Sequence, residues 1–264
     1  MTSVIVCGAA GRMGRLLVQL VAAEPEARLV AAVEASDHPA LGRDAGEVAG
    51  VPALGVRLAS DYSPTPDTVT LDFTAPEAAL AHMEAAAKAG AAIVVGTTGL
   101  SADQRARAEE LARRTRAVIA PNMSVGVAVL EGLVTAATRA LGDGFDAEIV
   151  EIHHRLKRDA PSGTALRLGE VLAQARGDHL SERACFGRSG EPGPRANREI
   201  GILGVRGGDV IGDHTVLFLG AGERIELTHR AQSRECLARG ALRAALWLPA
   251  QPAGLYTMRD VLGL

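Results

Sequence analysis

Hydrophobic and polar positions follow a repeating pattern from the start of the chain to about Asn122. Short β-branched or apolar runs occupy residues 4–7, 29–33, 69–73, 92–95 and 117–120, and each run ends near a polar residue or a glycine. Segments rich in Ala and Leu, with the period of a helix, separate these runs. Strands that alternate with helices in this way predict repeated βα units and therefore a parallel sheet.

Two of the intervening helices have clear limits in the sequence. One is expected to begin at Pro76, because proline suits the first helical position, and to end at Gly90, where glycine accepts a left-handed cap conformation. Ser101 followed by Gln104 matches a capping box and predicts the start of the next helix. These signals place each helix between two of the predicted strands.

The pattern changes in the second half of the chain. We expect a long helix over residues 125–141, a strand over 145–152, and a helix over 163–175. The polar, Gly- and Pro-rich residues 187–199 are too many for a tight connection and predict a mobile loop. Three extended runs within residues 199–231, divided by glycines, predict an antiparallel meander. A last helix, from Ser233 to about Leu248, is expected to return to the first half.

A glycine-rich turn follows the first predicted strand directly. Gly8, Gly11 and Gly14 have the spacing GxxGxxG and open a helix, where a pyrophosphate can approach backbone N–H groups at the positive helix end. Glu34 lies at the end of the second strand, where an acid can accept hydrogen bonds from an adenosine ribose. Glycines in a turn are common by themselves, but strand, turn, helix and acid in this order predict a dinucleotide site.

The choice between the two nicotinamide dinucleotides rests on charge. NADPH carries a 2′-phosphate, which favours an arginine near the second strand end, whereas Ala35 follows Glu34 here. Repulsion between Glu34 and that phosphate favours NADH, although Arg43 is able to compensate. Two later loops, GTTG at residues 96–99 and APNMS at residues 120–124, follow strand ends on the ligand-binding edge of such a sheet and are expected beside the nicotinamide.

Substrate chemistry is expected in the segment HHRLKRDAPSGTA. His153, His154 and Lys157 lie together there, and Lys157 is notable because Lys88 is the only other lysine of the chain. Hydride transfer to an imine or enamine leaves carbanion-like charge, so a nearby general acid must supply a proton. Ser162 to Thr164 open a helix and offer N–H groups and hydroxyls that suit a carboxylate, so the substrate is expected to be anionic.

Simpler explanations exist for each part of that segment. Adjacent histidines can be buried and satisfied, a basic run can be a solvated face, and SGT can be an ordinary helix cap. A metal site is disfavoured because no HxxxH, HExxH or clustered cysteines accompany His153 and His154. Because the two histidines are adjacent in an extended segment, they point to opposite sides, and only one need be catalytic.

Composition and charge exclude several classes of function. The net charge is −3, and acidic and basic residues are mixed along the chain, which disfavours nucleic-acid binding. No run of 18 apolar residues and no basic signal-peptide start are present, so we expect a cytoplasmic protein without a membrane segment. Cys7, Cys185 and Cys236 are widely spaced and predict free thiols.

The motifs GAAGRMGR, DFT, GTTG, APNMS, EIHHRLKRDAPSGTA, GVRGGDVIGDHTV and GLYTMRDVLGL together resemble the dihydrodipicolinate reductase family over nearly the whole chain. The resemblance implies an α/β fold in which a Rossmann-type parallel sheet forms the nucleotide domain, at residues 1–124 and 234–264. It also implies an inserted α+β domain with a mixed or antiparallel sheet, residues 125–233, for substrate binding and tetramer formation. The implied reaction uses NADH or NADPH to reduce a 4-hydroxy-tetrahydrodipicolinate, with loss of water, on the diaminopimelate route to lysine.

The resemblance also implies a role for each motif. It assigns the pyrophosphate to Gly8, Ala9, Ala10, Gly11, Arg12 and Met13, the ribose to Glu34, and the nicotinamide side to Gly96, Thr97, Thr98, Ala120, Pro121, Asn122 and Met123. It assigns proton transfer to His153 and Lys157, and substrate contacts to His154, Ser162, Gly163 and Thr164.

Two departures and two rivals accompany the resemblance. Many members carry arginine where this chain has Ala35, which puts NADPH use in doubt, and Met123 with Ser124 stands where phenylalanine is common. One rival is another dehydrogenase, acting on an amino-acid semialdehyde or on diaminopimelate, which HHRLK and SGT disfavour. The other rival is a regulator that senses NAD(H) without chemistry, which His153 and Lys157 disfavour.

Overall fold

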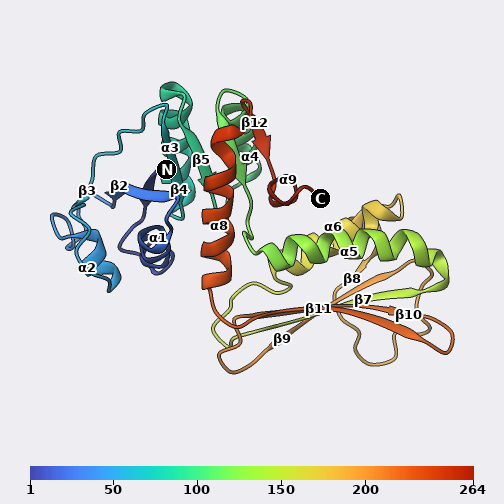
Figure 1. Cartoon of the computed structure of the whole chain (residues 1–264). Helices are drawn as coiled ribbons and strands as arrows, with labels where there is room; N and C mark the ends of the chain where they lie inside the picture. The colour runs from blue at the N-terminus through green and yellow to red at the C-terminus, as the bar shows by residue number, and fades with distance from the viewer. The chain divides into compact units, whose positions relative to one another are not determined.

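The computed structural model describes all residues 1–264 and divides the chain into two compact units. The first unit comprises Met1–Val125 with Glu235–Leu264, and the second comprises Gly126–Arg234. Figure 1 shows the last helix-rich segment, in red, among the elements of the first unit. The first unit is therefore built from both ends of the chain.

A seven-stranded sheet forms the centre of the first unit, and all of its strands pair in parallel. In spatial order the strands are β12 (Gly254–Tyr256), β6 (Arg116–Ile119), β5 (Ala92–Val95), β4 (Thr68–Asp72), β1 (Thr2–Cys7), β2 (Ala27–Val33) and β3 (Leu58–Ala59). The five strands expected from the hydrophobic runs are all present, which confirms the parallel sheet and the Rossmann-type fold. The two edge strands were not expected, because two or three residues carry no periodic signal.

Helices cover this sheet in two pairs. The helices of the unit are α1 (Arg12–Ala23), α2 (Ala45–Ala49), α3 (Pro76–Ala89), α4 (Ala102–Ala112), α8 (Glu235–Trp247) and α9 (Met258–Leu262), with a short 3₁₀ turn η2 (Leu248–Ala250). α1 packs on α8, and α3 packs on α4. Met83, Ile93 and Leu111 are buried between the sheet and the second pair. The predicted limits of α3 and the capping box of α4 are confirmed, with Gly90 in the left-handed region at φ 69°.

The second unit contains a five-stranded mixed sheet with two long helices on one face (Figure 1). Its strands, in spatial order, are β11 (Arg224–Ala231), β10 (Gly212–Leu219), β7 (Asp146–His153), β9 (Ile200–Arg206) and β8 (Ala184–Cys185). Its helices are α5 (Val125–Leu141), α6 (Gly163–Ala175) and α7 (Leu180–Arg183), with a 3₁₀ turn η1 (Gly142–Gly144) after α5. Leu130, Leu168, Ile149 and Phe218 belong to the core between sheet and helices.

The predicted antiparallel meander is wrong in one respect. β10 pairs with β11 antiparallel, as expected, but β9 lies on the far side of β7 and pairs with it in parallel. The connection from β9 to β10 crosses the end of β7, where Gly207 N–H donates to the His153 carbonyl and His154 N–H donates to the Val210 carbonyl. These hydrogen bonds pair backbone groups of the connection with the end of β7. The glycines between β9 and β10, which suggested a tight turn between neighbouring strands, therefore belong to a connection that passes over β7.

The polar residues 187–199 are tied to the sheet by ion pairs. Arg188 and Arg195 both donate to the buried carboxylate of Glu148 on β7, at distances from 2.7 to 3.1 Å. Arg195 also binds Asp146 at 2.8 Å. The segment predicted as a mobile loop is thus anchored at two points, by ion pairs between residues that are 40 and 47 positions apart in the sequence.

One helix is long and apolar enough to cross a membrane by length and composition alone, namely α5 with the turn that follows it. It contains Glu131 and Arg139, and its residues Leu130 and Val134 pack into the core of the second unit. A core helix of a soluble protein passes the same test, so this single helix is weak evidence for a membrane span.

Candidate active site

The predicted dinucleotide residues gather at one edge of the parallel sheet of the first unit. The glycine turn follows β1, Glu34 follows β2, and the loops at residues 96–99 and 120–124 follow β5 and β6. Because parallel strands share the direction of their carboxyl ends, all four segments reach the edge where such sheets bind ligands. The fold therefore places all four segments that the sequence predicted to bind the cofactor at one edge of the sheet.

The glycine turn has the geometry that a pyrophosphate requires. Gly8 adopts φ 72°, in the left-handed region, and a Cβ at Gly14 would overlap the Gly8 carbonyl and Ala9. Gly11 caps α1 without any side-chain hydrogen bond, so no side chain competes for the N–H groups of the first turn. Glu34 Oε2 accepts the Ala10 N–H at 2.9 Å, so the acid contacts the turn itself. These residues fit a nicotinamide dinucleotide.

A buried carboxylate lies at the part of this edge where β4 and β5 end. Asp72, at the end of β4, is fully buried and accepts hydrogen bonds from the Thr74 N–H and hydroxyl and from the Thr97 hydroxyl, at 2.8–3.1 Å. Its other oxygen lies 2.5 Å from His82 Nδ1. Asp72 therefore joins the DFT segment, the GTTG loop and α3. The sequence showed the DFT motif but not this partnership.

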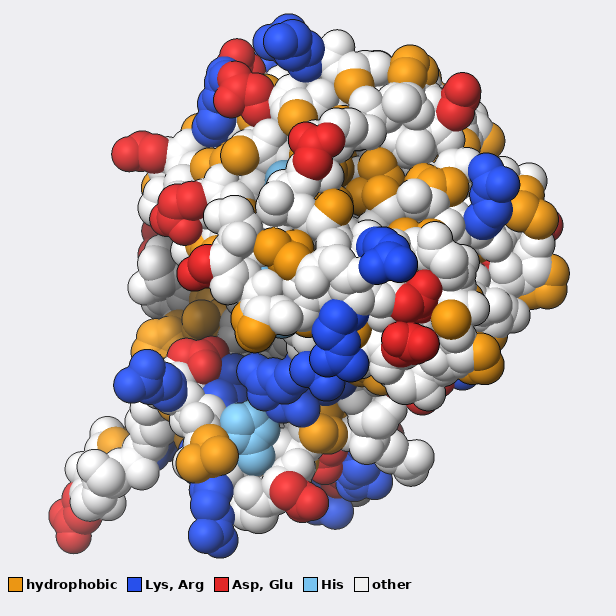
Figure 2. All heavy atoms as spheres, turned by 90° about the vertical axis from the view of Figure 1, so that its left-hand side faces the viewer, with side chains coloured by type: hydrophobic (Ala, Val, Ile, Leu, Met, Phe, Trp, Pro, Cys, Tyr) orange, Lys and Arg blue, Asp and Glu red, His pale blue; other side chains and the backbone are white.

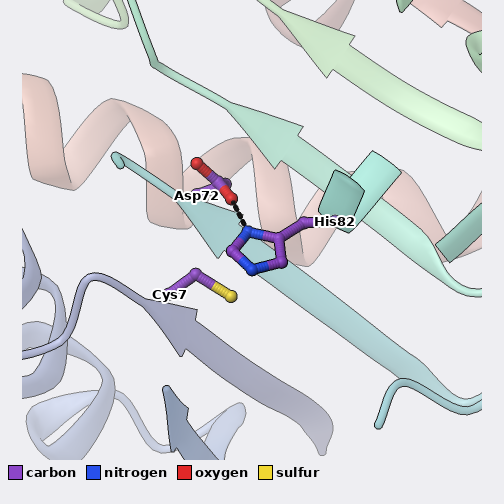
Figure 3. Close-up of side chains that lie close together, drawn as sticks. All are labelled: Cys7, Asp72 and His82. Carbon is purple, nitrogen blue, oxygen red and sulfur yellow. Dashed lines mark hydrogen bonds and ion pairs between the residues drawn. The ribbon is translucent and has the colours of Figure 1, made fainter. Parts of the chain in front are cut away.

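Figure 3 shows that Asp72, His82 and Cys7 lie side by side. Their potential ligand atoms lie within 4.8 Å of one another, so the residue types could hold a metal ion. The contacts favour a hydrogen-bonded cluster, because both Asp72 oxygens already accept bonds. Burial, together with the nearby Asp72 and Glu34 carboxylates, raises the pKa of the Cys7 thiol and disfavours the thiolate that a metal requires.

The predicted substrate residues lie together in the second unit, around the end of β7 and the start of α6. His153 is 8% exposed, its neighbour His154 is more exposed, and Lys157 follows in a turn closed by its N–H and the His154 carbonyl. Lys157 Nζ pairs with Asp159 at 2.9 Å. Gly163 and Thr164 form the first turn of α6, where helix N–H groups lack partners within the helix.

Ser162 has a different surrounding from the one expected for a substrate ligand. It is 2% exposed, its hydroxyl accepts the Ala165 N–H at 3.2 Å as the cap of α6, and it lies 3.1 Å from His214 Nε2. Its own N–H donates to Glu151 at 3.0 Å. These bonds engage the polar atoms of Ser162 within the second unit, so the residue supports the helix start that Gly163 and Thr164 present.

Sequence reasoning missed two charged residues beside His153. Glu151 is fully buried and accepts from His153 Nδ1 at 2.6 Å and from both terminal nitrogens of Arg206 at 2.7–2.8 Å. The period of a strand offered one signal, since Glu151 and His153 are two residues apart and share a face. Nothing local indicated Arg206, which lies 55 residues further along the chain.

The pKa values in this cluster follow from burial and charge. Burial lowers the pKa of His153, and the positive charges of Lys157 and Arg206 act in the same direction, against the opposing effect of Glu151. For Glu151, burial raises the pKa, but hydrogen bonds from Arg206, His153 and the Ser162 N–H outweigh it and lower the pKa overall. A neutral ring beside an ionised carboxylate is therefore favoured near pH 7.

Charge is otherwise evenly distributed over the visible surface. Figure 2 shows acidic and basic side chains interspersed on one face. A mixed surface of this kind lacks the extended single-sign field of a nucleic-acid binder.

Comparisons with known proteins place the chain in one family. The family described as "Dihydrodipicolinate reductase, N-terminus" matches residues 2–123, and "Dihydrodipicolinate reductase, C-terminus" matches residues 126–262. A protein of Anaeromyxobacter dehalogenans named 4-hydroxy-tetrahydrodipicolinate reductase is 53% identical, covering 100% of this chain and 98% of the relative. A protein of the same name from Geobacter sulfurreducens is 48% identical, over 100% of both chains.

A solved structure agrees with these relatives. It is a dipicolinate-bound dihydrodipicolinate reductase from Paenisporosarcina sp. TG-14, which is 26% identical, with a TM-score of 0.74 and 98% of each chain covered. Sequence and fold thus point to the same group of proteins. We conclude that the chain belongs to the dihydrodipicolinate reductase family and is an NAD(P)H-dependent oxidoreductase.

Proposed function

We propose that the protein reduces 4-hydroxy-tetrahydrodipicolinate to tetrahydrodipicolinate, with loss of water, on the diaminopimelate route to lysine. The observation that carries this proposal is the cluster of His153, Lys157 and the α6 start in one unit, in a chain about half identical to named reductases. The dipicolinate bound to the solved relative is a planar dicarboxylate of about the same size as the proposed substrate. Its presence there supports an anionic substrate for this protein.

For the cofactor, we assign the pyrophosphate to residues 8–13, the adenosine ribose to Glu34, and the nicotinamide side to residues 96–98 and 120–123. Reduced nicotinamide, when bound, supplies the hydride. Glu34 is placed for ribose hydroxyls, because its carboxylate already lies at the glycine turn. Ala35 offers no positive charge for a 2′-phosphate, so NADH is the proposed preference.

For the substrate, we assign carboxylate binding to Gly163 and Thr164 at the start of α6, with His154 as a further contact and Ser162 as the residue that fixes the helix start. Lys157 is the proposed general acid, because its ammonium carries a proton that the carbanion-like product of hydride transfer needs. His153 offers Nε2 to the substrate, since its Nδ1 is engaged with Glu151. In this arrangement the neutral His153 ring orients the substrate or accepts a hydrogen bond or proton from it, and Lys157 donates a proton.

We further propose a soluble homotetramer of the cytoplasm, formed through the sheet face that α5 and α6 leave open. Val150, Ile152, Leu203, Val205 and Leu217 share this face by strand alternation and register, and Val205 is 46% exposed. Apolar side chains that gather on an open sheet face are typical of an interface between subunits. Light scattering of the purified protein tests the number of chains.

The decisive experiment measures oxidation of NADH and of NADPH, with and without substrate. The substrate is generated in place by coupling dihydrodipicolinate synthase to pyruvate and aspartate semialdehyde. Oxidation that depends on substrate, faster with NADH, is the expected result. Cofactor binding without oxidation would instead favour a sensor of NAD(H) or a dehydrogenase for another anion, and would refute the proposal.

A further inference from the structure

We propose that Glu151, held by Arg206, is a positioning residue that fixes the ring of His153 and the start of α6 with a single carboxylate. This inference deepens the proposed function, because it rests on the roles of His153 and the α6 start in binding and reducing substrate. Glu151 does not touch the substrate in this scheme. It acts through the two groups that do.

The hydrogen bonds of Glu151 are saturated. Oε2 accepts from His153 Nδ1 at 2.6 Å and from one Arg206 nitrogen at 2.8 Å. Oε1 accepts from the Ser162 N–H at 3.0 Å and from the other Arg206 nitrogen at 2.7 Å. A fully buried carboxylate with two donors on each oxygen is held in one orientation, because any rotation would break several bonds at once.

The first consequence concerns the His153 ring. A carboxylate accepts and does not donate, so the proton of the neutral ring must sit on Nδ1, and Nε2 carries the lone pair. Ring orientation is fixed as well, since His153 and Glu151 point to the same face of β7. His153 is therefore presented in one tautomer and one orientation.

The second consequence concerns the helix that is proposed to bind the carboxylate. Ser162 is the N-cap residue of α6, and its N–H donates to Glu151 while its hydroxyl caps the helix. The end of β7 and the start of α6 are thereby joined through the same two oxygens. A shift of α6 relative to His153 would cost a buried, charge-assisted hydrogen bond.

Arg206 extends this connection to the lysine. Besides its two bonds to Glu151, Arg206 donates to the backbone carbonyl of Asp159 at 2.7 Å, and the side chain of Asp159 pairs with Lys157. Glu151 and Arg206 thus connect, within one unit, to His153, to the start of α6 and, through Asp159, to Lys157. No other buried carboxylate of the second unit has this set of partners, because Glu148 is bound by Arg188 and Arg195 on the opposite face of β7.

Glu151→Gln tests the proposal, with Glu148→Gln as the matched control. Glutamine keeps the shape, but its amide nitrogen donates where a carboxylate oxygen accepted. We expect Glu151→Gln to lower kcat on the order of 100-fold while the Kd of NADH, bound by the other unit, stays within about 3-fold. Glu148→Gln also loses a buried, arginine-bound charge on the same strand and is expected to keep kcat. Glu151→Asp, which keeps the charge, is expected to recover part of the loss.

Nitrogen NMR of the His153 ring provides a readout that does not depend on turnover. The wild type is expected to show the Nδ1–H tautomer, and Glu151→Gln or Glu151→Asp to show the other tautomer or a mixture, with the signal assigned by His153→Gln. Should the wild type reduce no substrate, the proposed function fails, and the tautomer comparison alone decides this inference. An unchanged tautomer in both variants, or an equal loss of kcat in Glu148→Gln, would overturn it.

Discussion

His214 should make the stability of the protein depend on pH below neutrality. It lies on β10, is 3% exposed, and has Nε2 at 3.1 Å from the Ser162 hydroxyl, while Nδ1 has no hydrogen-bond partner. Its ring meets that of His153 edge to face, with 5.1 Å between centroids. Burial, reinforced by the positive charge that His153 can carry, lowers the pKa of His214 from its ordinary value of 6.5 to about 4.

The sign and size of the effect follow from proton binding. As the pH falls, the unfolded chain protonates this histidine from pH 6.5 downward, whereas the folded chain does so only near pH 4. The unfolded state therefore gains stability first, and the contribution of neutral His214 is complete above pH 6.5 and lost between pH 6.5 and 4. The full difference corresponds to about 3 kcal/mol, of which about 2 kcal/mol is lost by pH 5.

Urea unfolding followed by circular dichroism, at about pH 7.5 and about pH 5, measures this loss. Other groups also titrate in this range, so the informative quantity is the difference between wild type and His214→Gln. Glutamine can still meet the Ser162 hydroxyl but does not titrate, so the variant should lose about 2 kcal/mol less than the wild type on acidification. His179→Gln, at an exposed histidine, should behave as wild type. An equal loss in His214→Gln and wild type would refute the reasoning.

Three further predictions concern turnover, cofactor choice and packing. Lys157→Ala should lower kcat at least about 100-fold and change the affinity for NADH by no more than a few fold, whereas Lys88→Ala, at the only other lysine, should leave kcat unchanged. Equal values of kcat for the two variants in steady-state assays would refute the role of Lys157 as the acid. Ala35→Arg should raise kcat/KM for NADPH relative to NADH by roughly 10-fold, and an unchanged ratio would show that Glu34 and Ala35 do not set the preference. Gly14→Ala should lower the free energy of unfolding by about 1–3 kcal/mol in thermal unfolding, because the added Cβ overlaps the Gly8 carbonyl. Gly132→Ala, in open space on α5, should leave stability unchanged or raise it, and the reverse order of stabilities would contradict the packing argument.

Most of the first unit was predictable because its signals are local. Five hydrophobic runs gave five strands, and Pro76, Gly90 and Ser101 marked helix limits through the conformations that these residues favour. The neighbours of β9 were not predictable, because hydrophobic alternation indicates a strand but does not say which strand lies beside it. The crossover past β7 depends on backbone bonds to its end, which leave no trace in composition.

The candidate site shows the same limit. His153, Lys157 and the α6 start were apparent because they share one short segment of unusual composition. The position of Glu151 could have been predicted, since strand periodicity puts it on the same face as His153. Its burial could not, because an acidic residue in a strand sequence does not indicate whether its side chain is buried. Arg206 and His214 arrive from β9 and β10, and only the mixed sheet brings them beside β7. The partners of His153 on β9 and β10 are therefore set by long-range strand pairing, which a local sequence pattern does not reveal.

The charges around His153 also bear on which group gives up the proton. Burial, Lys157 and Arg206 all reduce the proton affinity of the ring, and the ionised Glu151 offsets them only in part. A ring that is neutral near pH 7, with Nδ1 bound to a carboxylate, has no proton to give from Nε2. The lysine ammonium four residues later, paired with the more exposed Asp159, does have one. The placement of this buried carboxylate agrees with the proposed roles, in which the His153 imidazole accepts a proton and the Lys157 ammonium donates one. We expect protonation of His153 at low pH to remove the accepting role of its ring.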